Sequence, residues 1–253
     1  MKGIRVIAGR EVRSLFLSPL AWVVLAVVEF LLGYMFLAQV ELFLRVQPRL
    51  AGMDNAPGVT EVVVAELFRN GAVIALIIAP ILTMRLISEE RRNQTLTLLF
   101  SAPVSMLEIV LGKYLGVMIF FGAMWGMVAC MPLALYIGGQ LDIGMYAAGL
   151  MGGILLTGAF CAAGLYISTL TIYPAVAAIS SFGLLLLLWV VDWAGKSGDT
   201  VVGNVLAYMS ILHHYESLME GVFSSADVLY YLLFIALFLI LSVRRLDARR
   251  LPH

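Results

Sequence analysis

Residues 88–108 read SEERRNQTLTLLFSAPVSMLE and separate two long apolar runs, at about 70–87 and 109–137. A helix needs about 20 apolar residues to cross the roughly 30 Å hydrocarbon layer of a membrane. Both runs approach or exceed that length, so the charged segment between them must stand outside the bilayer. Two spans joined by a polar insert predict a helical membrane protein.

The composition supports the same fold class. Apolar residues make up 62% of the 253 residues and charged residues 13%, against roughly 45–50% apolar content in soluble domains. Six runs qualify as spans, at about 20–40, 70–87, 109–137, 143–169, 173–191 and 228–243. We therefore expect an all-α polytopic membrane protein with six transmembrane helices in a single domain, 1–253. The net charge is zero, and we expect no nucleic-acid partner.

The distribution of Lys and Arg predicts the orientation, because cytoplasmic loops carry an excess of these residues. With both termini on one side, that side holds twelve of the 16 basic residues. They are Lys2, Arg5, Arg10, Arg13, Arg85, Arg91, Arg92, Lys113, Arg244, Arg245, Arg249 and Arg250. Both termini and the 88–105 loop are thus expected in the cytoplasm. The N-terminus lacks the features of a cleaved signal peptide, so the first span should be retained.

Two amphipathic helices are predicted at the membrane surfaces. In 1–18, basic residues gather on one side and apolar residues on the other, as in an interfacial helix. Glu11 falls on the apolar side, where a polar partner is more expected than an unpaired charge. In 200–223, apolar residues recur at three- and four-residue steps on the outer side. That helix could pack flat, re-enter the membrane, line the mouth of a path or dock an accessory protein.

The 88–105 insert contains signals for two helices. Ser88 is a candidate N-cap, followed by Glu89 and Glu90 at the positive end of a helix. Ala102-Pro103 should end that helix, and Ser105 with Glu108 forms a capping box that starts the third span. The insert could serve as a docking element for a soluble partner or simply cover the end of the bundle.

Several polar residues are candidates for a functional site. Glu29 lies near the middle of the first span, where a carboxylate is costly; with Glu11 it suggests a translocation path or an internal polar network. Gly195-Lys196-Ser197 lacks the first glycine of a phosphate-binding loop. His213 and His214 supply too few ligands for zinc. We expect no catalytic residue, metal or cofactor on this chain.

The insert resembles the cytoplasmic loop of ABC-2 type transporter permeases, and more narrowly the branch of gliding-motility and nitrous-oxide-reductase-maturation permeases. The resemblance rests on 88–99, Ala102-Pro103-Val104-Ser105, Glu108 and Gly112-Lys113-Tyr114-Leu115. Two positions depart from the family pattern: Gln94 replaces a glycine and Thr97 an acidic residue. The remaining similarity extends over most of the chain and is less specific.

The resemblance implies a permease subunit in a bacterial inner membrane that performs export or mechanical work. ATP and Mg²⁺ would be bound by a separate ATP-binding subunit, and a second copy or a related permease would complete the pair. The insert would be a coupling helix that contacts the ATPase. The contact residues would be Glu89, Glu90, Arg91, Arg92, Thr95, Leu96, Leu98, Leu99 and Phe100. The alternatives are an ATP-independent channel or membrane assembly factor and, less favoured, an intramembrane enzyme. The substrate does not follow from the sequence.

Overall fold

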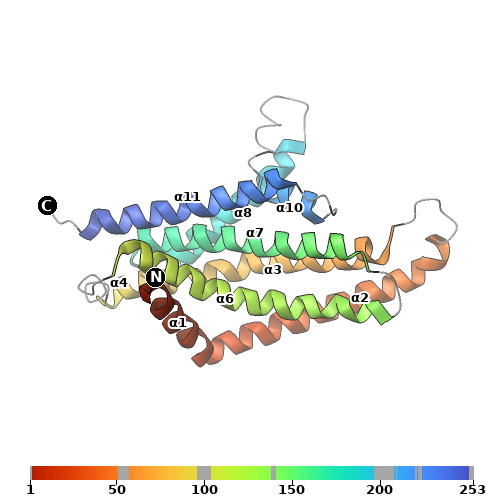
Figure 1. Ribbon diagram of the computed structural model, residues 1–253, viewed down its shortest axis with the longest axis horizontal. Helices are drawn as coiled ribbons and strands as arrows, with labels where there is room; N and C mark the ends of the chain where they lie inside the picture. Colours follow the sequence, from red (N-terminus) through yellow and green to blue (C-terminus); the bar gives the residue numbers. More distant parts are fainter. Residues whose placement is uncertain are drawn as a thin grey trace.

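The chain folds into a bundle of long helices that share one principal direction (Figure 1). This computed structural model describes residues 2–50, 57–95, 104–137, 141–196, 208, 210–219, 221 and 224–250. Within these ranges all regular structure is helical. The elements are α1 (Lys2–Leu17), α2 (Pro19–Leu50), the π-helix η1 (Thr60–Val64), α3 (Ala65–Thr83), α4 (Arg85–Arg92), α6 (Met106–Leu133), the 3₁₀-helix η2 (Ala134–Ile137), α7 (Ile143–Leu170), α8 (Pro174–Lys196), α10 (Ile211–Met219) and α11 (Ser225–Arg250).

Six helical stretches are long and apolar enough to cross a membrane, which confirms the predicted all-α polytopic fold. Helix α1, helix α4 and the end of α11 lie at one end of the bundle (Figure 1). We call this the α4 end. The first span is longer than predicted, because α2 continues to Leu50 through an exposed Arg45–Glu41 ion pair of 2.5 Å. Pairs at this spacing stabilise a helix that has left the apolar layer.

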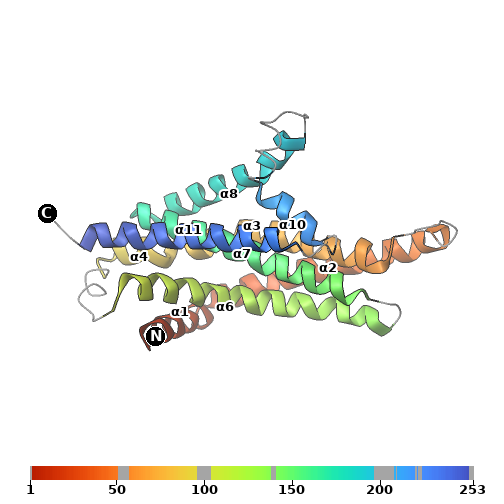
Figure 2. The same ribbon diagram turned by 45° about the horizontal axis from the view of Figure 1, so that its top comes forward.

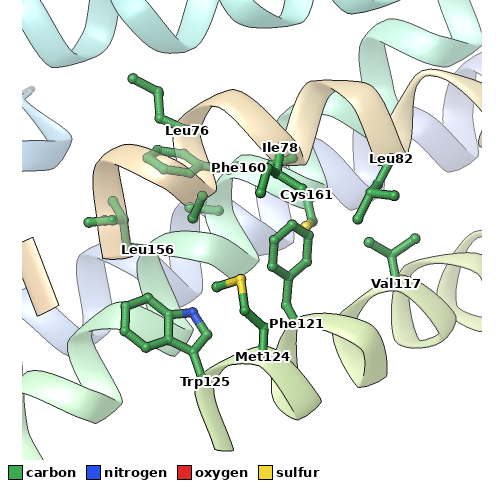
Figure 3. Packing of buried hydrophobic residues seen from close by; sticks show 14 of the residues in the cluster. Leu76, Ile78, Leu82, Val117, Phe121, Met124, Trp125, Leu156, Phe160 and Cys161 are labelled. Carbon is green, nitrogen blue, oxygen red and sulfur yellow. The ribbon is translucent and has the colours of Figure 1, made fainter. Parts of the chain in front are cut away.

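Helix α7 is the centre of the bundle. Of its most apolar window, 72% is buried, against 17% for the corresponding windows of α8 and α11. Side chains from α3 and α6 meet α7 in one apolar cluster that includes Leu76, Phe121 and Phe160 (Figure 3). Trp125 of α6 is buried there and donates a 3.0 Å hydrogen bond to Thr157 Oγ1. Burial of the indole N–H is therefore compensated.

Glycines on α7 allow this close packing. A Cβ added at Gly153 would lie 2.6 Å from the Trp125 ring, and one added at Gly149 would lie 2.7 Å from Phe68. Gly164 faces Thr83 of α3, whose Oγ1 would overlap an added Cβ. The small residues of the fourth span thus serve helix packing, as their four-residue spacing suggests.

Helix α10 packs on the bundle instead of standing free. Ile211, Tyr215 and Leu218 are buried, and α10 contacts α7, α8 and α11. Tyr215 donates a 2.8 Å hydrogen bond from its hydroxyl to the backbone oxygen of Phe68. Figure 2 shows α8 diverging from α11 away from the α4 end, with α10 between them. Of the predicted segment 200–223, residues 200–207, 209, 220, 222 and 223 lie outside the described ranges.

The first helix of the insert differs from its predicted form at both ends, whereas the second helix begins as predicted. Helix α4 ends at Arg92, ten residues before Ala102-Pro103, and Gln94 after it has a positive φ of 57° that does not continue a right-handed helix. Ser88 is not an N-cap: it lies inside α4, which begins at Arg85, and its hydroxyl bonds the backbone oxygen of Met84. The capping box at the start of α6 is confirmed. Ser105 Oγ accepts from the Glu108 N–H at 3.2 Å, and Glu108 Oε2 accepts from the Ser105 N–H at 3.3 Å.

Candidate functional site

Helix α1 crosses the start of α6 at very short range. Two glycines of α6 make this approach possible: a Cβ on Gly112 would lie 2.7 Å from Ile7 Cβ, and one on Gly116 would lie 2.5 Å from Glu11 Cβ. Glycine is the residue that permits such approach between helix backbones. At this crossing, the Glu11 side chain of α1 lies against α6.

A buried lysine joins three elements at this crossing. Lys113 of α6 is only 2% exposed, and its Nζ lies 2.5 Å from Glu11 Oε1 of α1 and 2.8 Å from Glu90 Oε1 of α4. We call Glu11, Lys113 and Glu90 the Lys113 clamp. The two carboxylates are about a fifth exposed. Two acids on one buried ammonium compensate its desolvation, and removal of both would leave an unpaired buried charge.

Helix α4 is also fixed to the end of α7. Ser168 Oγ accepts from the backbone N–H groups of Ile87 and Ser88, both at 3.0 Å, and donates to the Met84 oxygen at 3.1 Å. Arg91 donates to the backbone oxygens of Thr169 and Thr171 at 3.0 and 3.1 Å. These acceptors stand at the C-terminal end of α7, where carbonyl groups lack helical partners and favour a cation. A shift of α4 would therefore pull on α7 as well as on the clamp.

The predicted contact residues fall into distinct groups. Glu90 and Arg91 bind other parts of this chain, while Glu89, Arg92 and Thr95 are exposed at the α4 end. Leu96, Leu98, Leu99 and Phe100 lie outside the described residues.

Lys113 and Ser168 are functional candidates that sequence reasoning did not select. The sequence contained two signals for the clamp. Lys113 lies two turns inside an apolar helix, and Glu11 falls on the apolar side of 1–18. Ser168 gave none, because a serine in a span commonly bonds only its own helix.

The surroundings of Glu11 and Glu29 differ. Glu11 is bound to Lys113, whereas Glu29 is half-buried in α2 and its Oε1 has no hydrogen-bond partner among the described residues. Within the described ranges, no hydrogen bond or ion pair joins the two acids.

On the opposite half of the bundle, His214 is held by its own surroundings. Its Nδ1 lies 2.6 Å from Asp227 Oδ1, its Nε2 lies 3.0 Å from the Tyr208 oxygen, and its ring stacks on Tyr230. Both ring nitrogens are therefore engaged, which suits a structural link between α10 and α11. Gly195 and Lys196 lie within α8, so these residues do not form a loop around a phosphate.

Comparison with known proteins identifies the family. The family model described as ABC-2 family transporter protein matches residues 5–251. The chain belongs to the ABC-2 transporter family. No curated protein matches it. ABC-2 permeases are transmembrane subunits that generally work with an ATP-binding subunit, and a multi-pass permease agrees with the six spans. The α4 end carries the polar contacts that such a partner could act upon.

Proposed function

We propose that this chain is an ABC transporter permease that converts ATP hydrolysis by separate subunits into export or mechanical work at the inner membrane. The α4 end then faces the cytoplasm, in agreement with its excess of Lys and Arg. Two permease chains, identical or related, would pair with two ATP-binding subunits. Family membership supports the permease role, and the contacts of α4 support the coupling.

The Lys113 clamp is the observation that carries this proposal. It joins α4, which leads into the insert, to α1 and to α6. An ion pair around an ammonium that is 2% exposed resists separation, because separation would leave that charge buried without compensation. Force applied to α4 would consequently move α1 and α6 with it. The bonds from Arg91 and Ser168 would pass the same force to α7.

The geometry divides the insert into two working faces. Glu90 and Arg91 face the permease, so we assign them to transmission of the movement. Glu89, Arg92 and Thr95 are exposed, and we assign Arg92 and Thr95, together with 96–100, to contact with the ATPase. Reversing the charge of Glu90 or Arg91 would perturb the permease itself, whereas Arg92 offers a test of docking alone.

Reversal of one exposed charge tests this docking. We expect Arg92→Glu to lower the amount of ATP-binding subunit that copurifies with the tagged permease by about tenfold, because a charge contact in a binding interface is replaced by repulsion. Arg13→Glu is the matched control: it reverses an exposed arginine on α1 and should leave copurification unchanged. Equal recovery of the ATPase with Arg92→Glu would contradict the assigned contact. A native complex that contains no nucleotide-binding chain would favour an ATP-independent channel instead.

A further inference from the structure

A cavity of about 500 Å³ lies beside the Lys113 clamp, inside the elbow formed by α1 and α2 and facing α3 and α4. Its volume falls within the range of pockets that hold small organic molecules. One wall is the elbow itself, for example Ser14 of α1 and Ala21 of α2. The facing wall includes Leu86 of α4 and Asn93, which directly follows α4. All three residues of the Lys113 clamp line this cavity.

The lining is divided between charged and apolar side chains. The charged side chains are three bases and three acids: Arg10, Arg85, Lys113, Glu11, Glu89 and Glu90. The apolar part includes Leu15, Leu20, Ile81 and Leu82. Such a division matches an amphiphile with a charged head, and the balanced charge favours a head that carries both signs over a simple anion.

Some of these charges are already satisfied and others are not. Lys113 is bound by Glu11 and Glu90, which leaves Arg10 and Arg85 as the available cations. Neither arginine has a hydrogen bond or ion pair to any part of the chain that the structure describes. The second carboxylate oxygen of Glu90, Oε2, is buried and likewise has no partner within the described ranges. The cavity thus offers two cationic groups and an unsatisfied acidic acceptor.

A row of exposed apolar side chains on α3, which we call the track, ends at this cavity. On α3, Val73, Ile77 and Ile81 are 41%, 49% and 41% exposed and recur at four-residue steps, which places them along one side of the helix. The next residue at this step is Arg85. Arg10 of α1 and Arg85 line the same cavity, and α1 has the pattern of a helix that lies at the boundary of headgroups and acyl chains. We therefore place Arg85 at headgroup depth and the track below it at acyl depth.

We propose that this cavity binds a zwitterionic phospholipid with a primary ammonium, drawn from the leaflet at the α4 end. Its phosphate lies beside Arg10 and Arg85, its ammonium beside Glu89 and Glu90, and one acyl chain along Val73, Ile77 and Ile81. Arginine suits the phosphate because its N–H groups match the phosphate oxygens. The site needs no ATPase, so its failure would be distinct from a failure of the coupling proposal.

Lipid retention tests the site directly. The full chain is reconstituted in bilayer discs with equal amounts of phosphatidylethanolamine and phosphatidylglycerol. It is then released into mild detergent, and the lipids that remain bound are identified by native mass spectrometry. We expect wild-type protein to retain one phosphatidylethanolamine in preference to phosphatidylglycerol. Arg85→Gln and Arg10→Gln should each lower the retained fraction about fivefold, the effect of about one basic contact at a membrane surface. Glu89→Gln should shift the preference toward phosphatidylglycerol.

The control separates this site from general attraction of the basic face for lipid. Arg13→Gln removes an exposed arginine from α1 that does not line the cavity, and it should retain lipid as wild type does. Equal losses in Arg13→Gln and Arg85→Gln, or equal retention of the two lipids by wild type, would overturn the proposal. Displacement by soluble glycerophosphoethanolamine would assign the site to a free headgroup instead. A cross-link between two copies through Ile81→Cys would show that a second chain covers the track, and would also overturn it.

Discussion

Replacing both Glu11 and Glu90 by glutamine should lower the free energy of unfolding by about 3 kcal/mol, and by more than the sum of the two single changes. Each single change leaves Lys113 with one carboxylate, at 2.8 Å from Glu90 or 2.5 Å from Glu11. The double change leaves an ammonium that is 2% exposed without an anion. The partial exposure of the two carboxylates keeps each single effect near 1 kcal/mol. Unfolding in mixed micelles with increasing denaturing detergent measures the three values.

A triple variant supplies the control for this experiment. Adding Lys113→Met to the double variant removes the unpaired charge and keeps much of the side-chain length. Because neutral replacements of buried ion networks are often tolerated, the triple variant should recover most of the lost stability. If the double variant is as stable as wild type, or if Lys113→Met brings no recovery, the ion pairs do not hold this crossing together.

Gly164→Ala should lower the free energy of unfolding by about 2–3 kcal/mol, since overpacking of a filled core has costs of this order. An added Cβ would overlap Thr83 Oγ1 and lie 2.9 Å from Thr83 Cβ. Thr83 cannot turn away easily, because it is buried and its hydroxyl donates a 2.7 Å hydrogen bond to the Ala79 oxygen. The helices α3 and α7 must therefore move apart. Thermal unfolding of the purified chain measures the effect.

Two further variants make this test specific. Gly126→Ala adds the same methyl group to α6 at a position where, apart from the neighbouring residues and the backbone of its own helix, no atom lies within 4 Å, and it should be neutral or slightly stabilising. Adding Thr83→Ala to Gly164→Ala removes the overlapping hydroxyl and should restore part of the stability. Equal stability of Gly164→Ala and Gly126→Ala would mean that α3 and α7 do not pack as closely as described.

The spans were predictable because each is a long apolar run, and run length relates directly to membrane thickness. The ends of spans were less predictable. Helix α2 continues beyond its apolar run to Leu50, since exposed charges at helical spacing sustain a helix in water. The capping box at Ser105 was predictable because both of its bonds are local. The position of Ser88 inside a helix was not predictable, because bonds of Ser168 and Arg91 join α4 to a distant part of the chain.

The candidate site was predictable in position and only partly in its chemistry. The insert was recognised from its sequence, and its location at the α4 end follows from the alternation of spans. Which of its charges turn inward depends on partners in other helices, such as Lys113 for Glu90 and Thr169 for Arg91. Periodicity placed Glu11 on the apolar side of its helix, but it contained no information on which cation meets it there.

We expect ATP-driven movement of α4 to reach α1 through the Lys113 clamp. Hydrogen exchange of the assembled complex, measured with and without a trapped ATP analogue, tests it most directly. In wild type, nucleotide should change the exchange of peptides from both α4 and α1. In the folded triple variant with Glu11→Gln, Lys113→Met and Glu90→Gln, the change should persist in α4 and disappear from α1. A response of α1 in the triple variant equal to that of wild type would contradict transmission through the clamp.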